Sequence, residues 1–215
     1  MAMFKNRHDA GERLANKLKK YKGRKDVVVL ALPRGGIVIG YEIAKKLNVK
    51  LDILLVQKIG APSNPELGIG ALSEGKVSYL EKNIIKHLGL KKQDVKKTKE
   101  IAHFKLKTRI LKYRINRLLP SLKGKIIILV DDGLATGVTA QAAIKFIKKH
   151  NPKKIIFASP VCSYKSLEEI KKKVDETVPL LSTYDLFSIG YYYNDFNQVT
   201  DEQVLDMLDL INNKI

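Results

Sequence analysis

The chain of 215 residues has one cysteine, Cys162, and no tryptophan. A single cysteine excludes an internal disulfide framework and a cysteine-based metal centre, so we expect Cys162 to be a small buried residue. The four histidines lack the spacing of metal ligands, and we expect no metal held by protein side chains alone. Apolar runs stay well short of the ~20 residues of a membrane span, and the first residues lack the apolar segment of a signal peptide. These absences predict a cytoplasmic protein without a membrane partner.

Acidic residues are scarce, since 22 Asp and Glu stand against 40 Lys and Arg, for a net charge of +18. Residues 91–119 contain eleven basic and two acidic residues, so this segment alone carries +9, half of the total. One interpretation is a nucleic-acid surface. The other is a solvated helix face that also steers an anionic substrate. We favour the second because aromatic residues are not interleaved with the basic ones.

Short apolar runs alternate with helix-like segments along the chain. The runs predict strands, and the segments between them show helical spacing or helix-start signals. This alternation predicts one α/β domain over residues 1–215, with a central parallel sheet flanked by helices. The predicted strands are 27–32, 51–56, 126–130, 154–158 and 178–181, and the predicted helices are 9–21, 37–47, 91–119, 140–150 and two that begin near 166 and 200.

Two segments give more specific expectations. Residues 60–70 are rich in Gly, Pro, Ser and Asn, which predicts a loop or flap, and residues 71–80 predict a hairpin. Within 91–119, apolar residues recur at the spacing of one helix face, which we expect to pack into the core of a helix that ends at Pro120. These residues are Ile101, Phe104, Leu111, Ile115 and Leu118.

The most informative stretch is 130–139, where a predicted strand ends in Asp131 and Asp132 and a helix follows shortly after. Small and hydroxyl residues between them leave backbone N–H groups free to converge on an anion at the helix start. Two carboxylates cannot themselves hold phosphate, so they need sugar hydroxyls, a divalent cation, or both. A ribose with a 5′-phosphate and a magnesium-bound pyrophosphate supplies an anion, sugar hydroxyls and a divalent cation together. The alternative is an acid pair that only ends a strand and caps a helix.

This stretch resembles the signature of type I phosphoribosyltransferases, which use phosphoribosyl pyrophosphate (PRPP). The resemblance implies the type I phosphoribosyltransferase fold, in which a small hood is added to the α/β core, here from about 59–90 and 183–215. It also implies that Asp131 and Asp132 bind the ribose hydroxyls. The residues that it places around the 5′-phosphate are Ala135, Thr136, Gly137, Val138 and Thr139.

Arg34, Gly35 and Gly36 follow the first predicted strand. Amides of a glycine turn at a helix start can hold pyrophosphate, and arginine can pair phosphate oxygens in a bidentate manner. In the family this is the pyrophosphate loop, and a basic residue in a position similar to Lys58 neutralises the departing pyrophosphate beneath a closing flap. The alternatives are an ordinary strand–helix turn with an exposed arginine and a solvated lysine at a strand end.

Six of the fifteen aromatic residues lie in 184–196. They suit stacking on a planar acceptor, and the resemblance places the acceptor's pocket in such a segment, where we name Phe187, Tyr191 and Tyr193. A small satellite core is the equal alternative. Many 6-oxopurine enzymes have an acid where this loop has Ala135, which weakens a hypoxanthine or guanine acceptor without establishing adenine.

Beyond these motifs the chain is similar to a bacterial and archaeal group of predicted phosphoribosyltransferases of unassigned acceptor. The similar segments are 4–11, 30–36, 57–71, the stretch 130–139 and 193–202. The resemblance implies an enzyme of nucleotide metabolism, a Mg²⁺-dependent glycosyltransferase (pentosyltransferase) that moves phosphoribose from PRPP to a nucleobase-like nitrogen and releases pyrophosphate. Two alternatives stay open, a PRPP- or nucleotide-sensing regulator that binds nucleic acid and a hydrolase or phosphorylase. The acceptor and any homo-oligomer also stay open.

Overall fold

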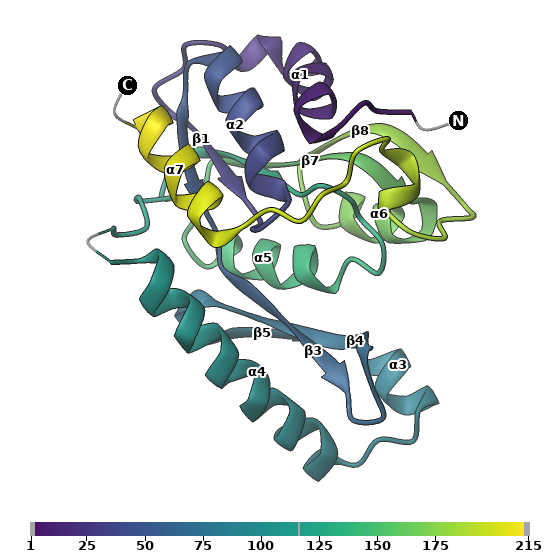
Figure 1. Ribbon diagram of the computed structural model, residues 1–215. Helices are drawn as coiled ribbons and strands as arrows, with labels where there is room; N and C mark the ends of the chain where they lie inside the picture. The colour runs from purple at the N-terminus through teal and green to yellow at the C-terminus, as the bar shows by residue number, and fades with distance from the viewer. Residues whose placement is uncertain (1–2, 116, 213–215) are drawn as a thin grey trace.

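The central sheet of the computed structural model, which describes residues 3–115 and 117–212, is parallel throughout. Its five strands run in the order β2-β1-β6-β7-β8 (Figure 1). The predicted α/β fold with a parallel sheet flanked by helices is therefore confirmed. The strands are β1 (Val27–Ala31), β2 (Lys50–Ile53), β6 (Ile126–Val130), β7 (Lys154–Ser163) and β8 (Glu176–Thr183).

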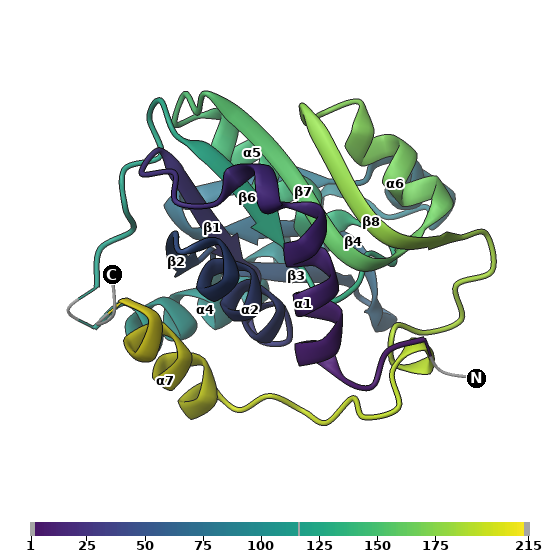
Figure 2. The same ribbon diagram turned by 90° about the horizontal axis from the view of Figure 1, so that it is seen from above.

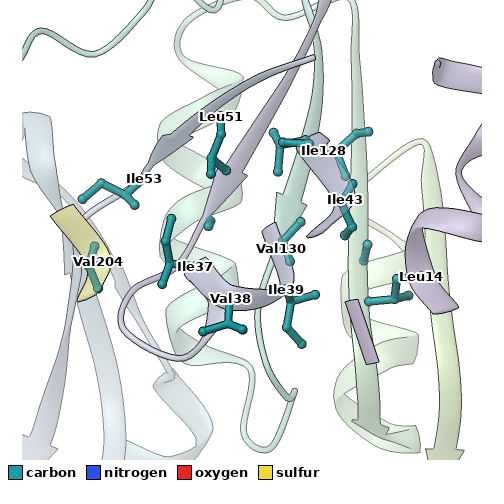
Figure 3. Close-up of a cluster of buried hydrophobic side chains, with 14 of the residues drawn as sticks. Leu14, Ile37, Val38, Ile39, Ile43, Leu51, Ile53, Ile128, Val130 and Val204 are labelled. Carbon is teal, nitrogen blue, oxygen red and sulfur yellow. The ribbon is translucent and has the colours of Figure 1, made fainter. Parts of the chain in front are cut away.

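The strands at the centre of the sheet are apolar on both faces. Every residue of β1 and β6 is buried, which is the pattern of a parallel strand covered by helices on both sides. The core shown in Figure 3 fills the space between one face and its helices, where Leu51, Ile128 and Val130 face Ile39 and Ile43. Leu30, Ile127 and Leu129 belong to a second cluster on the opposite face.

Helices cover both faces of the sheet (Figures 1 and 2). One face carries α1 (Arg7–Lys17), α2 (Gly36–Leu47) and α7 (Asp201–Asn212), and the other carries α5 (Val138–Lys148) and α6 (Tyr164–Lys171). No helix among residues 3–115 and 117–212 is long and apolar enough to cross a membrane. Three short 3₁₀ turns complete the helical segments, at Lys19–Tyr21, Glu74–Lys76 and Gly190–Tyr192.

A smaller antiparallel sheet of β3 (Val56–Ala61), β4 (Asn64–Ser73) and β5 (Val77–Leu80) lies beside α5. The predicted hairpin at 71–80 is confirmed, but the predicted loop at 60–70 is wrong, because most of this segment lies in β3 and β4. Its glycines permit close backbone approach: a Cβ on Gly60 would lie 2.3 Å from the carbonyl oxygen of Pro65, and one on Gly70 2.4 Å from that of Tyr79.

Helices α3 (Lys82–His87) and α4 (Lys92–Tyr113) follow, and Figure 1 shows the small sheet between α5 and α4. The prediction for the apolar face of α4 is wrong. Its buried residues are Ala102, Leu106 and Tyr113, whereas the predicted core residues are exposed, with Ile101 at 57%, Phe104 at 72%, Leu111 at 65%, Ile115 at 66% and Leu118 at 94%. Periodicity shows which residues share a face, but it does not show which face meets the sheet. The helix also ends at Tyr113, before Pro120.

Candidate active site

Two loops meet where the neighbouring strands β1 and β6 end. Ala31 pairs with Val130 in the sheet, and the N–H of Leu32 donates to the carbonyl of Val130 at 2.8 Å. The carboxyl ends of parallel strands lie at one edge of the sheet, where ligands bind in open α/β folds. The loop from Pro33 to Gly36, whose Pro33–Arg34 peptide is cis, therefore lies beside the acid pair.

Glycine is required at this junction because the two loops touch. A Cβ on Gly36 would lie 3.0 Å from the carbonyl oxygen of Val130, and one on Gly35 would lie 1.8 Å from Oδ2 of Asp132. No other residue fits at position 35 unless the Asp132 carboxylate moves. The carboxylate and the amides at the start of α2 thus share one small volume.

The two acids lie in different surroundings. Oδ1 of Asp131 accepts a 2.9 Å hydrogen bond from the N–H of Asp132, and burial, with the charge of Asp132, raises the pKa of the Asp131 carboxyl well above its ordinary value. Asp132 instead forms an ion pair with Arg7, 2.8 Å from Nε to Oδ2. The site therefore holds one carboxyl that resists ionisation and one that is paired with a cation.

The segment after the acids leads into the start of α5 and is anchored to β7. The Leu134 N–H donates to Val161 at 2.8 Å and its carbonyl accepts from Ser163 at 2.7 Å, which ties the loop to the end of β7. Gly137 precedes the helix with φ of +74°, a left-handed conformation that favours glycine. The amides of the first turn of α5 have no partner within the helix. Ala135 and Thr136 are exposed, Gly137 and Val138 buried, and Thr139 half-buried.

Two arginines lie at the loop after β1, Arg34 within it and Arg109 in contact with it. The Arg34 side chain is 39% exposed, and its Nη1 lies 3.9 Å from Oδ1 of Asp201. Arg109 from α4 donates to the carbonyl of Pro33 at 3.2 Å and to that of Val56 at 2.9 Å. Burial lowers the pKa of Arg109, and the nearby charge of Arg34 acts in the same direction. The two guanidinium groups thus lie beside the loop, with the Asp201 carboxylate near them.

Lys58 lies within β3 of the smaller sheet rather than at the end of a strand of the central sheet. Its Nζ donates to the backbone oxygen of Glu66 at 2.7 Å and to its carboxylate at 3.1 Å. A Cβ on Gly68 would lie 3.2 Å from Cδ of Lys58 and 3.0 Å from Cγ2 of Val138. The stem of Lys58 is thus separated from the start of α5 only by a glycine.

The aromatic residues predicted for the acceptor pocket lie in different surroundings. Tyr193 is buried, and its hydroxyl donates to the backbone oxygen of Asp132 at 2.7 Å. Burial raises the pKa of this phenol. Phe187 and Tyr191 are 89% and 65% exposed. The structure therefore places Tyr193 against the acid pair and leaves the other two rings on the surface.

Several side chains at the site were not anticipated from the sequence. They include Arg7, Arg109 and Asp201, and also Tyr164, whose ring stacks on Tyr184 of the predicted aromatic segment with centroids 4.3 Å apart. The pair follows the carboxyl ends of β7 and β8, and this position was the signal that could have identified it. Cys162 is buried, as predicted, and burial raises the pKa of its thiol to about 12, which disfavours a nucleophilic role.

Comparison with known proteins gives a consistent result. The phosphoribosyl transferase domain family matches residues 3–195. Rv0571c of Mycobacterium tuberculosis, provisionally named a phosphoribosyl transferase, is 37% identical over 211 residues, which cover 97% of this chain and 47% of that protein. A uracil phosphoribosyltransferase of Aquifex aeolicus is 36% identical over 67 residues, 31% of this chain and 32% of its own.

Among solved structures, TT1426 from Thermus thermophilus is 36% identical, with a TM-score of 0.79 over 95% of this chain and 97% of that chain. The chain spans about half the length of Rv0571c. The resemblance inferred from the motifs is confirmed, and the chain belongs to the phosphoribosyl transferase domain family.

Proposed function

We propose that the chain is a Mg²⁺-dependent transferase that moves the 5-phosphoribosyl group from PRPP to a nucleobase-like nitrogen acceptor. The observation that carries this proposal is the contact between the Asp131–Asp132 pair and the Gly35–Gly36 turn at the ends of two neighbouring strands. An anion-binding helix start follows the same pair. One edge of the sheet thus presents groups suited to a sugar, a phosphate and a pyrophosphate.

In the proposed reaction the acceptor nitrogen bonds to C1 of the ribose while the bond from C1 to the pyrophosphate oxygen breaks. Pyrophosphate leaves with the electron pair, and the acceptor nitrogen loses its proton to solvent or to a base. Positive charge develops on the ribose ring and negative charge on pyrophosphate. The protein's contribution is then mainly positioning and electrostatic stabilisation.

Each part of the site has a role in this reaction. Asp131 and Asp132 would form hydrogen bonds with the ribose hydroxyls, and the Asp132 carboxylate would balance part of the charge on the ring. The amides from Ala135 to Thr139 would bind the 5′-phosphate. Arg34, Lys58 and the amides of the Gly35–Gly36 turn would stabilise pyrophosphate, for which Lys58 must exchange Glu66 for the ligand.

The side chains at the site are compatible with a Mg²⁺ ion that binds together with PRPP. Among residues 3–115 and 117–212 no three His, Cys, Asp or Glu side chains gather as metal ligands. Mg²⁺ prefers oxygen ligands and retains several waters, so pyrophosphate oxygens and water would satisfy it without a ligand from the protein. When bound, the metal would neutralise pyrophosphate charge.

The test is calorimetric titration of Mg–PRPP into the wild type, into a double variant with Asp131→Asn and Asp132→Asn, and into Asp26→Asn. Asp26 precedes β1 at the opposite end of the same sheet and pairs with Arg24, so it is a matched carboxylate away from the site. We expect binding in the wild type and Asp26→Asn and none in the double variant. Equal binding by all three proteins would contradict the assigned site.

The acceptor follows from a second measurement, pyrophosphate release with a panel of nucleobases. We propose that the segment with Phe187, Tyr191 and Tyr193 borders the acceptor, together with the Tyr164–Tyr184 pair. Ala135 favours a base other than hypoxanthine or guanine. Release with one base alone identifies the acceptor, and phosphoribose formed without any base would favour a hydrolase.

The exposed lysines of α4 favour a second candidate function, a regulator that senses PRPP or a nucleotide and binds nucleic acid. Lys96, Lys97, Lys105 and Lys107 are all exposed. Phosphate contacts make such binding steeply salt-dependent. Binding of single- or double-stranded oligonucleotides that weakens with salt and responds to PRPP would support this function, and no binding at low salt would contradict it.

A further inference from the structure

The first residue of α1 reaches into the acid-pair site. Nε of Arg7 donates to Oδ2 of Asp132 at 2.8 Å, and Nη1 donates to the backbone oxygen of Asn197 at 2.8 Å. Its guanidinium carbon lies 3.7 Å from the centroid of the Phe196 ring. The Arg7 side chain is only 10% exposed. A buried guanidinium that is paired, hydrogen-bonded and covered by an aromatic face is held in one orientation.

The same contacts determine where the Asp132 carboxylate lies. A Cβ on Gly35 would come within 1.8 Å of Oδ2 of Asp132 and 2.8 Å of Nε of Arg7, so the ion pair rests directly on the glycine turn. The backbone of Asp132 is held separately by the Tyr193 hydroxyl at 2.7 Å. Oδ1 of Asp132 has no donor among the described residues. Arg7 thus fixes one oxygen of the Asp132 carboxylate, and the Asp131 carboxyl interacts with the same group.

Hydrogen bonds between the N-terminal segment and residues 194–195 stabilise this arrangement. The carbonyl of Phe4 accepts from Asn194 at 2.9 Å, and the carbonyl of Lys5 accepts from Asp195 at 3.0 Å. The rings of Phe4 and Tyr193 lie 5.3 Å apart. The segment 4–11, for which the motif comparison supplied no role, therefore joins the segment 190–197 and directs Arg7 at Asp132.

We propose that Arg7 is a positioning residue that holds Oδ2 of Asp132, so that Oδ1 faces a ribose hydroxyl of PRPP. This inference rests on the proposed function. Arg7 touches neither the reacting carbon nor the leaving group, and it acts through the carboxylate. Its charge also opposes the rise in the pKa of the Asp131 carboxyl, which burial and Asp132 cause. Loss of Arg7 should therefore disturb the orientation of Asp132 and the ionisation of Asp131.

The test compares Arg7→Gln and Arg7→Lys with Arg24→Gln. Arg24 forms an exposed ion pair with Asp26 at the other end of β1, with Nη2 2.7 Å from Oδ2, so its variant breaks an arginine–aspartate pair far from the site. We expect Arg7→Gln to weaken Mg–PRPP binding about 10- to 100-fold, the scale of one charged hydrogen bond. Arg7→Lys should recover part of the loss, and Arg24→Gln should bind like the wild type.

A ligand-free measurement separates this proposal from the proposed function. The carboxyl carbon of Asp131 is titrated by ¹³C NMR in the three variants and the wild type. We expect its midpoint to move to higher pH in Arg7→Gln but not in Arg7→Lys, which keeps the charge. A purely structural role would move it in both or in neither, and wild-type Mg–PRPP binding by folded Arg7→Gln, with an unchanged midpoint, would overturn the proposal. If Arg7→Gln does not fold, Arg7→Lys decides, because wild-type binding by that variant would also overturn it. Failure of the wild type to bind PRPP would refute the proposed function and the role of Oδ1 toward ribose, while this titration would still show whether Arg7 acts on the acid pair.

Discussion

The carboxylate of Asp132 rests against the backbone of Gly35, so closely that a Cβ on Gly35 would lie 1.8 Å from Oδ2. Gly35 itself has φ of −59°, which any residue adopts. The glycine is therefore required by the space that the carboxylate occupies and not by the conformation of the backbone. This contact couples the two loops that the proposed function assigns to the sugar and to pyrophosphate.

We expect Gly35→Ala to displace the Asp132 carboxylate and to weaken Mg–PRPP binding at least tenfold. Overpacking of this kind should also lower the free energy of unfolding by about 1–3 kcal/mol. Gly23→Asn is the control, because Gly23 has φ of +70° and open space around its Cβ position, and asparagine tolerates that conformation. Calorimetry and urea denaturation measure both effects, and full binding by Gly35→Ala would contradict the tight contact.

Asp131 should make stability depend on pH. Folding raises the pKa of this carboxyl, so the folded state holds its proton more tightly than the unfolded state. The stability from Asp131 is then fully present below its ordinary pKa of about 4 and falls as pH rises toward the raised value. We expect Asp131→Asn to gain stability relative to the wild type as pH increases from about 4 to 8, measured by urea denaturation.

Asp26 supplies the control of opposite sign. The hydrogen bond from Arg24 holds the pKa of the Asp26 carboxyl below its ordinary value, so its contribution is present above about pH 4 and is lost in more acidic solution. Asp26→Asn should differ from the wild type by a constant amount between about pH 5 and 8. If the difference in stability between Asp131→Asn and the wild type did not change over the same pH range, folding would not raise the pKa of Asp131.

Tyr193→Phe removes the hydroxyl that donates to the backbone of Asp132 while keeping the ring against Phe4. Because the carbonyl loses its partner in a largely buried place, we expect a loss of about 1–3 kcal/mol in the free energy of unfolding. Tyr191→Phe, at a ring that is 65% exposed, should change it by less than about 0.5 kcal/mol. Equal effects in the two variants would mean that the Tyr193 hydroxyl bond contributes nothing.

Substitutions on the two faces of α4 should change the free energy of unfolding by different amounts. Leu106 is 3% exposed and Phe104 is 72% exposed. We expect Leu106→Ala to cost about 2–5 kcal/mol, the range for buried leucines, and Phe104→Ser to stay within about 0.5 kcal/mol. Chemical denaturation of both variants checks this, and a large loss in Phe104→Ser would restore the original prediction that this face is packed.

Local patterns in the sequence were sufficient for most of the central sheet and for the motifs at its edge, although the predicted strand 51–56 joins the end of β2 to the start of β3. Val27–Ala31 and Ile126–Val130 are apolar throughout, and such runs are typical of strands covered on both faces. Because the carboxyl ends of parallel strands share one edge, the meeting of Arg34–Gly36 with Asp131–Thr139 was predictable from the order of elements alone. The glycines at 60 and 70 misled the prediction because close strand crossing and loop flexibility both select glycine.

The sequence by itself determined the parallel sheet, with its alternation of strands and helices, and the loops that carry charged residues and glycines. These features follow from residues that are neighbours in the chain. Only the tertiary structure decided that Arg7 meets Asp132 across 125 positions, that Arg109 supports Pro33, and that Phe104 faces outward while Leu106 is buried. Such contacts depend on how whole elements pack against one another. A single side chain near the start of the chain therefore carries no local sign of the carboxylate that it holds.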